Sequence, residues 1–158
     1  MTPTTRPQSS TTPTTPRDPV NTPSARSTWE ELVEAVRATG RYRTTAEAAR
    51  VTRVVLSALG GQLTGDERAE LARSLPEEAA RPLASEVPLS RPLTAPEFVD
   101  NVATRIEGAT PDTARWDVSS VLGTLPQRAG TQLIDRVLTQ LPPGYALLFG
   151  IPKLTPAS

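Results

Sequence analysis

Cysteine and histidine are both absent from this chain of 158 residues. Without cysteine the chain can form no disulfide, no thiolate nucleophile and no thiolate metal ligand. Without histidine it lacks the commonest general base and the commonest metal ligand. The composition therefore excludes most metal and catalytic-triad chemistry, and we expect no catalytic residue, no metal site and no cofactor.

An excess of charge of either sign is also lacking. The 17 basic residues balance the 17 acidic ones, which gives a formal net charge of +0. No overall field then draws the protein toward nucleic acid or anionic lipid. A charged partner must be recognised by a local patch.

Long apolar runs are missing as well. No stretch of the sequence approaches the ~20 apolar residues of a membrane span. The first residues contain no run of roughly 7 to 15 apolar residues, which a secretory signal requires. We therefore expect a cytoplasmic protein that makes no contact with a membrane.

Residues 1–27 form a segment of distinct composition. They contain eight Thr and six Pro, and Met1 and Val20 are their only large apolar residues. Such a segment cannot bury enough apolar surface to offset the entropy lost on ordering. We expect a disordered tail, which is either a docking segment for a partner or a solubilising leader.

The rest of the chain resembles itself at an offset of 66 residues. Residues 28–84 align without gaps with residues 94–150, and twelve positions are identical, among them Val33 with Val99. This pattern predicts a duplicated helical unit. The linker, residues 85–93, is too short to separate independent domains, so we expect one helical domain over residues 28–154.

Helix start signals recur through both copies. A threonine followed three residues later by glutamate, the pattern of a capping box, occurs four times. The four threonines are Thr28, Thr44, Thr64 and Thr94. In the second copy Thr110 precedes Pro111, a residue well suited to the first helical position. Two consecutive glycines, Gly60 and Gly61, predict a left-handed helix end.

The predicted fold class is all-α. Apolar residues recur at helical spacing behind each start signal, in stripes one face wide. We expect two tandem copies of a three- to four-helix unit. Their apolar stripes would pack against each other as one compact domain about a pseudo-two-fold axis.

A short segment follows the third helix of each copy, after a Leu-Pro pair. The second of these segments, residues 143–150, is strongly apolar and includes Tyr145, Leu148 and Phe149. Two interpretations stay open for these side chains. Either the other repeat buries them, or they form a contact surface for a partner.

The repeated motifs resemble those of a known family. These are Glu-(Leu/Phe)-Val-x-x-Val at residues 31–36 and 97–102, and the helices at residues 48–59 and 114–125 with a Val-Leu-x-x-Leu ending. With the Leu-Pro pairs, they resemble the bacterial DUF 2267 family over about residues 28 to 150. The resemblance implies an all-helical tandem fold without an agreed activity. It supplies no catalytic residue.

Carboxylate pairs are the remaining candidates for catalysis. Glu97 lies near Asp100 and Asp112 near Asp117, and paired carboxylates share acid and base roles when one of them is buried. All of them fall on predicted polar faces or in first turns, where a negative charge favours the helix dipole. No nucleotide-binding or hydrolase motif is present. We expect that the protein is not an enzyme.

Arginine offers a candidate binding patch around the first interhelical loop. The candidates for phosphate or nucleic-acid contact are Arg37, Arg41, Arg43, Arg50 and Arg53. Glu47 is the one acid within this stretch, and Tyr42 is its one aromatic residue. The alternative is a solvated, partly ion-paired face. For Trp29 and Trp116 we favour core packing over ligand stacking.

These observations predict a non-catalytic protein-interaction or adaptor domain. Its partner would be another protein, bound in a groove between the two halves. One alternative is a nucleic-acid-associated protein that uses the arginine patch. A third is a carboxylate-based enzyme, which the missing histidine disfavours. The residues do not determine the oligomeric state.

Overall fold

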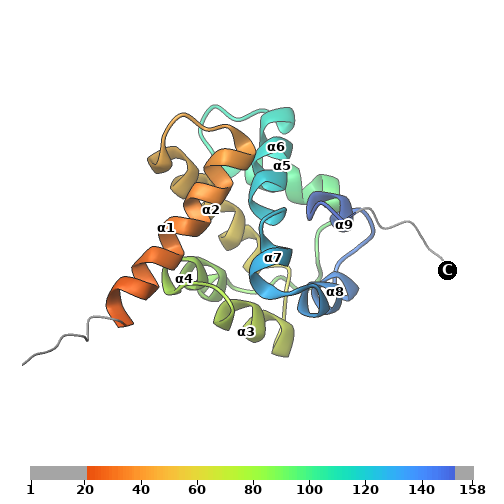
Figure 1. Ribbon diagram of the computed structural model, residues 1–158. Helices are drawn as coiled ribbons and strands as arrows, with labels where there is room; N and C mark the ends of the chain where they lie inside the picture. The colour runs from red at the N-terminus through yellow and green to blue at the C-terminus, as the bar shows by residue number, and fades with distance from the viewer. Residues whose placement is uncertain (1–20, 152–158) are drawn as a thin grey trace, which may run out of the picture.

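Helices make up every regular element of residues 21–151, the part of the chain that the computed structural model describes. Figure 1 shows how they are arranged. In order they are α1 (Asn21–Gly40), α2 (Thr45–Gly60), α3 (Gly65–Arg73), α4 (Glu77–Ser85), α5 (Ala95–Arg105), α6 (Pro111–Leu122), α7 (Leu125–Ala129), α8 (Thr131–Thr139) and α9 (Tyr145–Leu148). The predicted all-α class is confirmed for these residues.

The first helix begins earlier than the sequence predicted. Thr28 was expected to cap it, yet α1 starts at Asn21. The capping box predicted at Thr28 is therefore wrong, because this residue lies inside the helix. Pro23 lies in the first turn, where its missing N–H breaks no bond. Residues 1–20 of the predicted tail lie outside the described residues.

The capping signals of the second half form as predicted. The Thr94 side chain accepts a bond from the Glu97 N–H, and the Glu97 carboxylate accepts one from the Thr94 N–H. Thr110 caps α6 in the same way with Thr113, and Pro111 occupies the first turn. These bonds satisfy N–H groups that a helix end otherwise leaves without partners.

The signals of the first half form in part. The Thr44 side chain accepts from the Glu47 N–H, as predicted for a cap. The Thr64 side chain makes no such bond, so the capping box predicted there is wrong. Instead Gln140 of the second half bonds both the Thr64 N–H and the Thr64 carbonyl, each at 3.1 Å. A partner distant in the sequence replaces the local cap.

The core is built around α2, which contacts α1, α4, α5 and α6. Its inward face includes Val55, Leu56 and Leu59, all fully buried. Burying one such side chain stabilises a fold by about 1.5–3 kcal/mol. Figure 1 shows α1 and α6 lying beside each other over this helix. The predicted apolar stripes therefore meet in a single core.

Gly60 and Gly61 end α2 by a different mechanism from the predicted left-handed cap. Gly61 has φ −73°, in the right-handed region, so that prediction is wrong. A Cβ on Gly60 would lie 2.1 Å from the carbonyl oxygen of Leu83 in α4. Arg68 reinforces this contact, because its guanidinium donates to the Gly60 and Leu83 carbonyls, each at 3.1 Å. Gly60 is thus required by the close approach of α4.

The linker, residues 85–93, runs extended from α4 to α5 and is tied to the end of α2. The Leu89 N–H donates to the Gly61 carbonyl at 2.8 Å. The Leu93 N–H donates to the Gln62 side chain at 2.7 Å. These bonds hold the two halves in one body.

Candidate interaction surface

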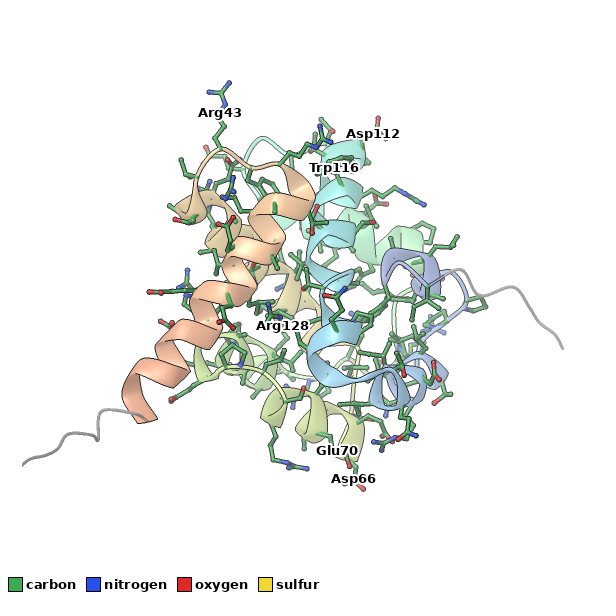
Figure 2. All side chains as sticks on the ribbon, in the orientation of Figure 1. Arg43, Asp66, Glu70, Asp112, Trp116 and Arg128 are labelled. Carbon is green, nitrogen blue, oxygen red and sulfur yellow. The ribbon has the colours of Figure 1, made fainter. Side chains whose placement is uncertain are left out.

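The loop between α1 and α2, residues 41–44, carries two of the predicted arginines at one end of the molecule. Arg41 has φ 58°, in the left-handed region that a side chain with a Cβ rarely adopts. Arg41 and Arg43 are both exposed. Figure 2 shows Arg43 pointing away from the helices. These two guanidinium groups are accessible to a partner.

The other predicted arginines have different surroundings. Arg37 forms a two-bonded ion pair with Glu34, at 2.9 and 2.7 Å. The Arg53 guanidinium lies 4.9 Å from the centre of the Trp29 ring, a cation–π contact. Arg50 is exposed beside Glu47 on another face of α2. Arg37 also donates to the Tyr42 carbonyl at 3.4 Å, so it borders the loop that carries Arg41 and Arg43, whereas Arg53 is engaged with Trp29.

Two neighbouring residues of α6 hold this loop in place. The Trp116 indole N–H donates to the Gly40 carbonyl at 2.9 Å. The Tyr42 hydroxyl donates to the Asp117 carboxylate at 2.6 Å. Burial, together with the bond to Asp117, raises the pKa of the Tyr42 hydroxyl, so it remains a proton donor at neutral pH. Bonds from the second half therefore hold the loop, together with those that Arg37 makes to the Tyr42 backbone.

Asp117 is buried, although the sequence placed it on a polar face. Its side chain is 8% exposed, so that prediction is wrong. The pKa of the Asp117 carboxyl is raised, mainly because burial disfavours its charged form. The hydrogen bond from the Tyr42 hydroxyl acts in the opposite direction, and the nearby Glu47 carboxylate adds to the increase. The carboxylate is accommodated there because Tyr42, distant in the sequence, supplies a hydrogen bond.

Trp116 and Trp29 have opposite surroundings. Trp29 is 8% exposed, which confirms its predicted place in the core. Trp116 is 53% exposed, so its predicted core packing is wrong. Exposed Arg115 precedes it in the sequence, and Gly40, its hydrogen-bond acceptor, precedes Arg41. We use the name Trp116 face for Trp116 together with the three exposed arginines next to it or close to Gly40 in the sequence, which are Arg41, Arg43 and Arg115.

The partner contact predicted for the C-terminal segment is not present as exposed surface. Tyr145, Leu148 and Phe149 are 0%, 2% and 1% exposed, so burial is the interpretation that the structure bears out. The Tyr145 hydroxyl donates to the Leu93 carbonyl at 2.7 Å, and its ring centre lies 5.5 Å from that of Phe98. The segment closes the core of the second half.

A hollow of about 680 Å³ lies between α3 and the turn from α7 to α8. Its wall contains Glu70, Arg73, Ser74 and Arg136, and Leu133 is its one large apolar residue. Recognition of an amphipathic helix needs rows of exposed apolar side chains. This hollow between the halves lacks such rows, so the Trp116 face is the better candidate for a partner.

Comparison with known families places the chain. The family model described as "Uncharacterized conserved protein (DUF2267)" matches residues 29–148. The chain belongs to the DUF2267 family. The suspected resemblance is therefore confirmed over nearly the range predicted from the sequence. No curated protein matches the chain.

A metal site and a membrane span each have requirements that the described residues of this DUF2267 chain would have to meet. Residues 21–151 contain no group of three or more acidic side chains arranged to hold a metal ion. Within the same range no helix has the length and apolar character needed to cross a bilayer. The expected cytoplasmic location stays a prediction.

Proposed function

We propose that this DUF2267 chain is a non-catalytic protein-interaction domain that binds its partner through the Trp116 face. The observation that supports this most directly is the state of Trp116. Its side chain is 53% exposed, yet its indole N–H is fixed to the Gly40 carbonyl at 2.9 Å. Exposing a large aromatic side chain forgoes the stabilisation of burying it.

A fixed aromatic residue is well suited to recognition. Tryptophan and arginine are enriched among the residues that dominate binding energy at protein interfaces. A side chain held in one orientation before binding loses less entropy when the complex forms. The bond from Tyr42 to Asp117 restricts the arginine loop in the same way. The Trp116 face is therefore largely organised without a partner.

The charge of this face defines the partner. Three positive charges come from Arg41, Arg43 and Arg115. One negative charge comes from Asp112, which lies on α6 with Arg115. Figure 2 shows Asp112 and Trp116 at the same end of α6. We infer an acidic protein segment with an apolar residue that packs on the indole ring. Complementary charge would favour such a segment and speed its association.

We further propose that the two halves are tandem copies related by a pseudo-two-fold axis. The helices α3 and α8 correspond residue for residue at the offset of 66, as Gly65–Arg73 and Thr131–Thr139. In keeping with such an axis, α1 packs on α6 and α5 packs on α2. Glu70 and Arg136 are equivalent positions and form an ion pair. Equivalent positions can touch only near the axis.

The repeat explains why only one such face would exist. The position equivalent to Trp116 in the first half is Arg50, and that equivalent to Gly40 is Ile106. The first half therefore has no indole at this position to fix the corresponding loop. A duplicated scaffold would carry a single binding face of this kind.

Nucleic-acid binding is the second candidate, and one observation favours it. The Trp116 ring lies beside the loop that carries Arg41 and Arg43, and single-stranded nucleic acid is bound by stacking on aromatic rings with arginines at the phosphates. A titration with a single-stranded oligonucleotide at two salt concentrations tests it. Binding should weaken steeply with salt and also when Trp116 is replaced by alanine. No binding at low salt would exclude this candidate.

The proposed protein interaction is tested by comparing two truncations of exposed apolar residues. Trp116→Ala removes the centre of the proposed face, and Leu147→Ala, at a 64% exposed site on α9, is the matched control. Immobilised wild type and the control should retain the same stoichiometric partner from an extract of the native cells. Trp116→Ala should retain about tenfold less, the loss expected at an interface hot spot. Equal retention by both variants would contradict the proposal.

A further inference from the structure

A second cavity lies between α2, the end of α5 and α6. It encloses about 460 Å³. The α2 wall consists of Glu47, Arg50, Val51 and Val54, and Asp117 is the contribution of α6. We call it the Asp117 cavity. It shares no residue with the Trp116 face, but its Asp117 also bonds Tyr42 of the arginine loop.

Asp117 is a buried carboxylate without a counter-ion in the described part of the chain. Its side chain is 8% exposed, and among residues 29–151 its one hydrogen-bond donor is the neutral Tyr42 hydroxyl. Within residues 29–151 no arginine lies at ion-pair distance from it. Buried charges in proteins are normally paired, because removing a charge from water is costly. The nearby Glu47 carboxylate makes this environment more negative still.

The arginines beside the cavity do not supply that counter-ion. Arg105 lies in its wall, but its guanidinium bonds Asn101, Ser57 and Glu86 at 2.9 to 3.3 Å. Arg50 is exposed, and within residues 29–151 it forms no ion pair with Asp117. A bound cation would supply the positive charge that Asp117 lacks among these residues.

The other residues of the cavity wall indicate which kind of group would carry the cation. Val51 is 4% exposed, and Val54 and Ile106 are partly buried, so the lining between the charged groups is aliphatic. Glu107 adds another carboxylate to the wall. An apolar stem would lie against these side chains while a cationic head reached Asp117.

We propose that the Asp117 cavity binds a small organic cation, in which an ammonium or guanidinium group on a short aliphatic stem bonds the Asp117 carboxylate. A charge-assisted bond of this kind is stronger than a neutral one, and more so in a site shielded from water. The cation supplies the counter-ion that the fold omits. Val51, Val54 and Ile106 hold its stem.

Titration of the full-length protein with n-butylammonium, followed by two-dimensional amide NMR, tests the proposal. Saturable shifts should appear at Val51, Val54, Ile106 and Asp117, with the millimolar affinity expected for a ligand of about five heavy atoms. The neutral analogue 1-butanol should bind about tenfold or more weakly, since it cannot form the charged bond. Equal binding of the two probes, or no saturable shift with n-butylammonium, would overturn the proposal.

Three variants complete the test. Asp117→Asn should weaken n-butylammonium about tenfold or more, and Asp135→Asn, at an exposed site on α8, should leave its affinity unchanged. Val54→Phe should fill the cavity and abolish binding with the carboxylate still present, which keeps the test decisive if Asp117→Asn fails to fold. Unchanged affinity in both Asp117→Asn and Val54→Phe would place the cation elsewhere and refute this site.

Discussion

The contact between α2 and α4 gives a sharp prediction, because two adjacent glycines there should respond oppositely to alanine. A Cβ on Gly60 would lie 2.1 Å from the Leu83 carbonyl oxygen and 2.9 Å from its carbon. Both are backbone atoms, so no side-chain rotation relieves the clash, and α4 must move outward. A Cβ on Gly61 would make ordinary van der Waals contacts, with the Glu86 side chain at 3.4 Å and with the Ala58 and Val87 carbonyl oxygens at 3.5 and 3.6 Å.

The expected energies follow from these distances. Overpacking a well-packed core costs about 1–3 kcal/mol, and displacing α4 would also stretch the bonds from Arg68 to the Gly60 and Leu83 carbonyls. We therefore expect Gly60→Ala to lower the free energy of unfolding by about 3 kcal/mol. Gly61→Ala should change it by less than about 1 kcal/mol, since alanine also reduces the entropy of the unfolded chain.

Urea denaturation followed by circular dichroism measures both variants against wild type. The midpoint of Gly60→Ala should fall with an unchanged slope, and that of Gly61→Ala should stay close to wild type. Gly60→Ala would stabilise the protein by up to about 1 kcal/mol if the site were an ordinary helix interior. That gain, or an equal response of the two glycines, would refute the described packing of α4 on α2.

Three further predictions concern the polar bonds. Tyr42→Phe should lower the free energy of unfolding by about 1–3 kcal/mol, because it leaves the buried Asp117 carboxylate without a donor; urea denaturation at pH 7 measures this, and no change would contradict it. Asp117→Asn tests the sign of the raised pKa of Asp117. Because the folded protein binds the Asp117 proton more tightly than the unfolded chain does, protonation of Asp117 adds to the free energy of unfolding. This contribution is fully present below the ordinary pKa of 3.8 and is lost as the pH rises through the raised pKa of the folded state. The stability of wild type relative to Asp117→Asn should therefore be greater at pH 4 than at pH 7, and a pH-independent difference would argue against a raised pKa. Arg68→Ala should destabilise by about 2 kcal/mol or more in a thermal melt, because the Gly60 and Leu83 carbonyls lose their shared donor, and an unchanged melting temperature would show that solvent replaces it.

Features that depend on local bonds could be predicted from the sequence. Thr94 and Thr110 cap their helices with partners three residues away, so the pattern alone specifies the bond. Thr64 carries the same pattern, but Gln140 approaches from the other half and replaces the local cap. The role of Gly60 could not be predicted either, because a left-handed helix end and a close contact between helices both favour glycine.

The candidate interface was the least predictable part. Trp116 and Asp117 are neighbours on α6, and the sequence assigned the tryptophan to the core and the aspartate to the polar face. The structure has the reverse, with Trp116 53% and Asp117 8% exposed. The reason is tertiary, because Gly40 and Tyr42 bond these two side chains from the other half of the chain. The apolar stripe of α6 is buried as its periodicity predicts, but contacts from α1, α2, α5 and α9 also cover positions beside that stripe, among them Asp117.

The proposed interaction through the Trp116 face is tested most directly by photo-cross-linking. A photoreactive phenylalanine analogue replaces Arg43 on the arginine loop, and the same analogue at exposed Asp135 on α8 serves as the control. Irradiation in native cells should join the Arg43 variant to one protein, with the adduct mapped to an acidic segment, and the control should give no such adduct. Adducts only to nucleic acid, or the same adducts from both positions, would contradict a protein-binding face at Trp116.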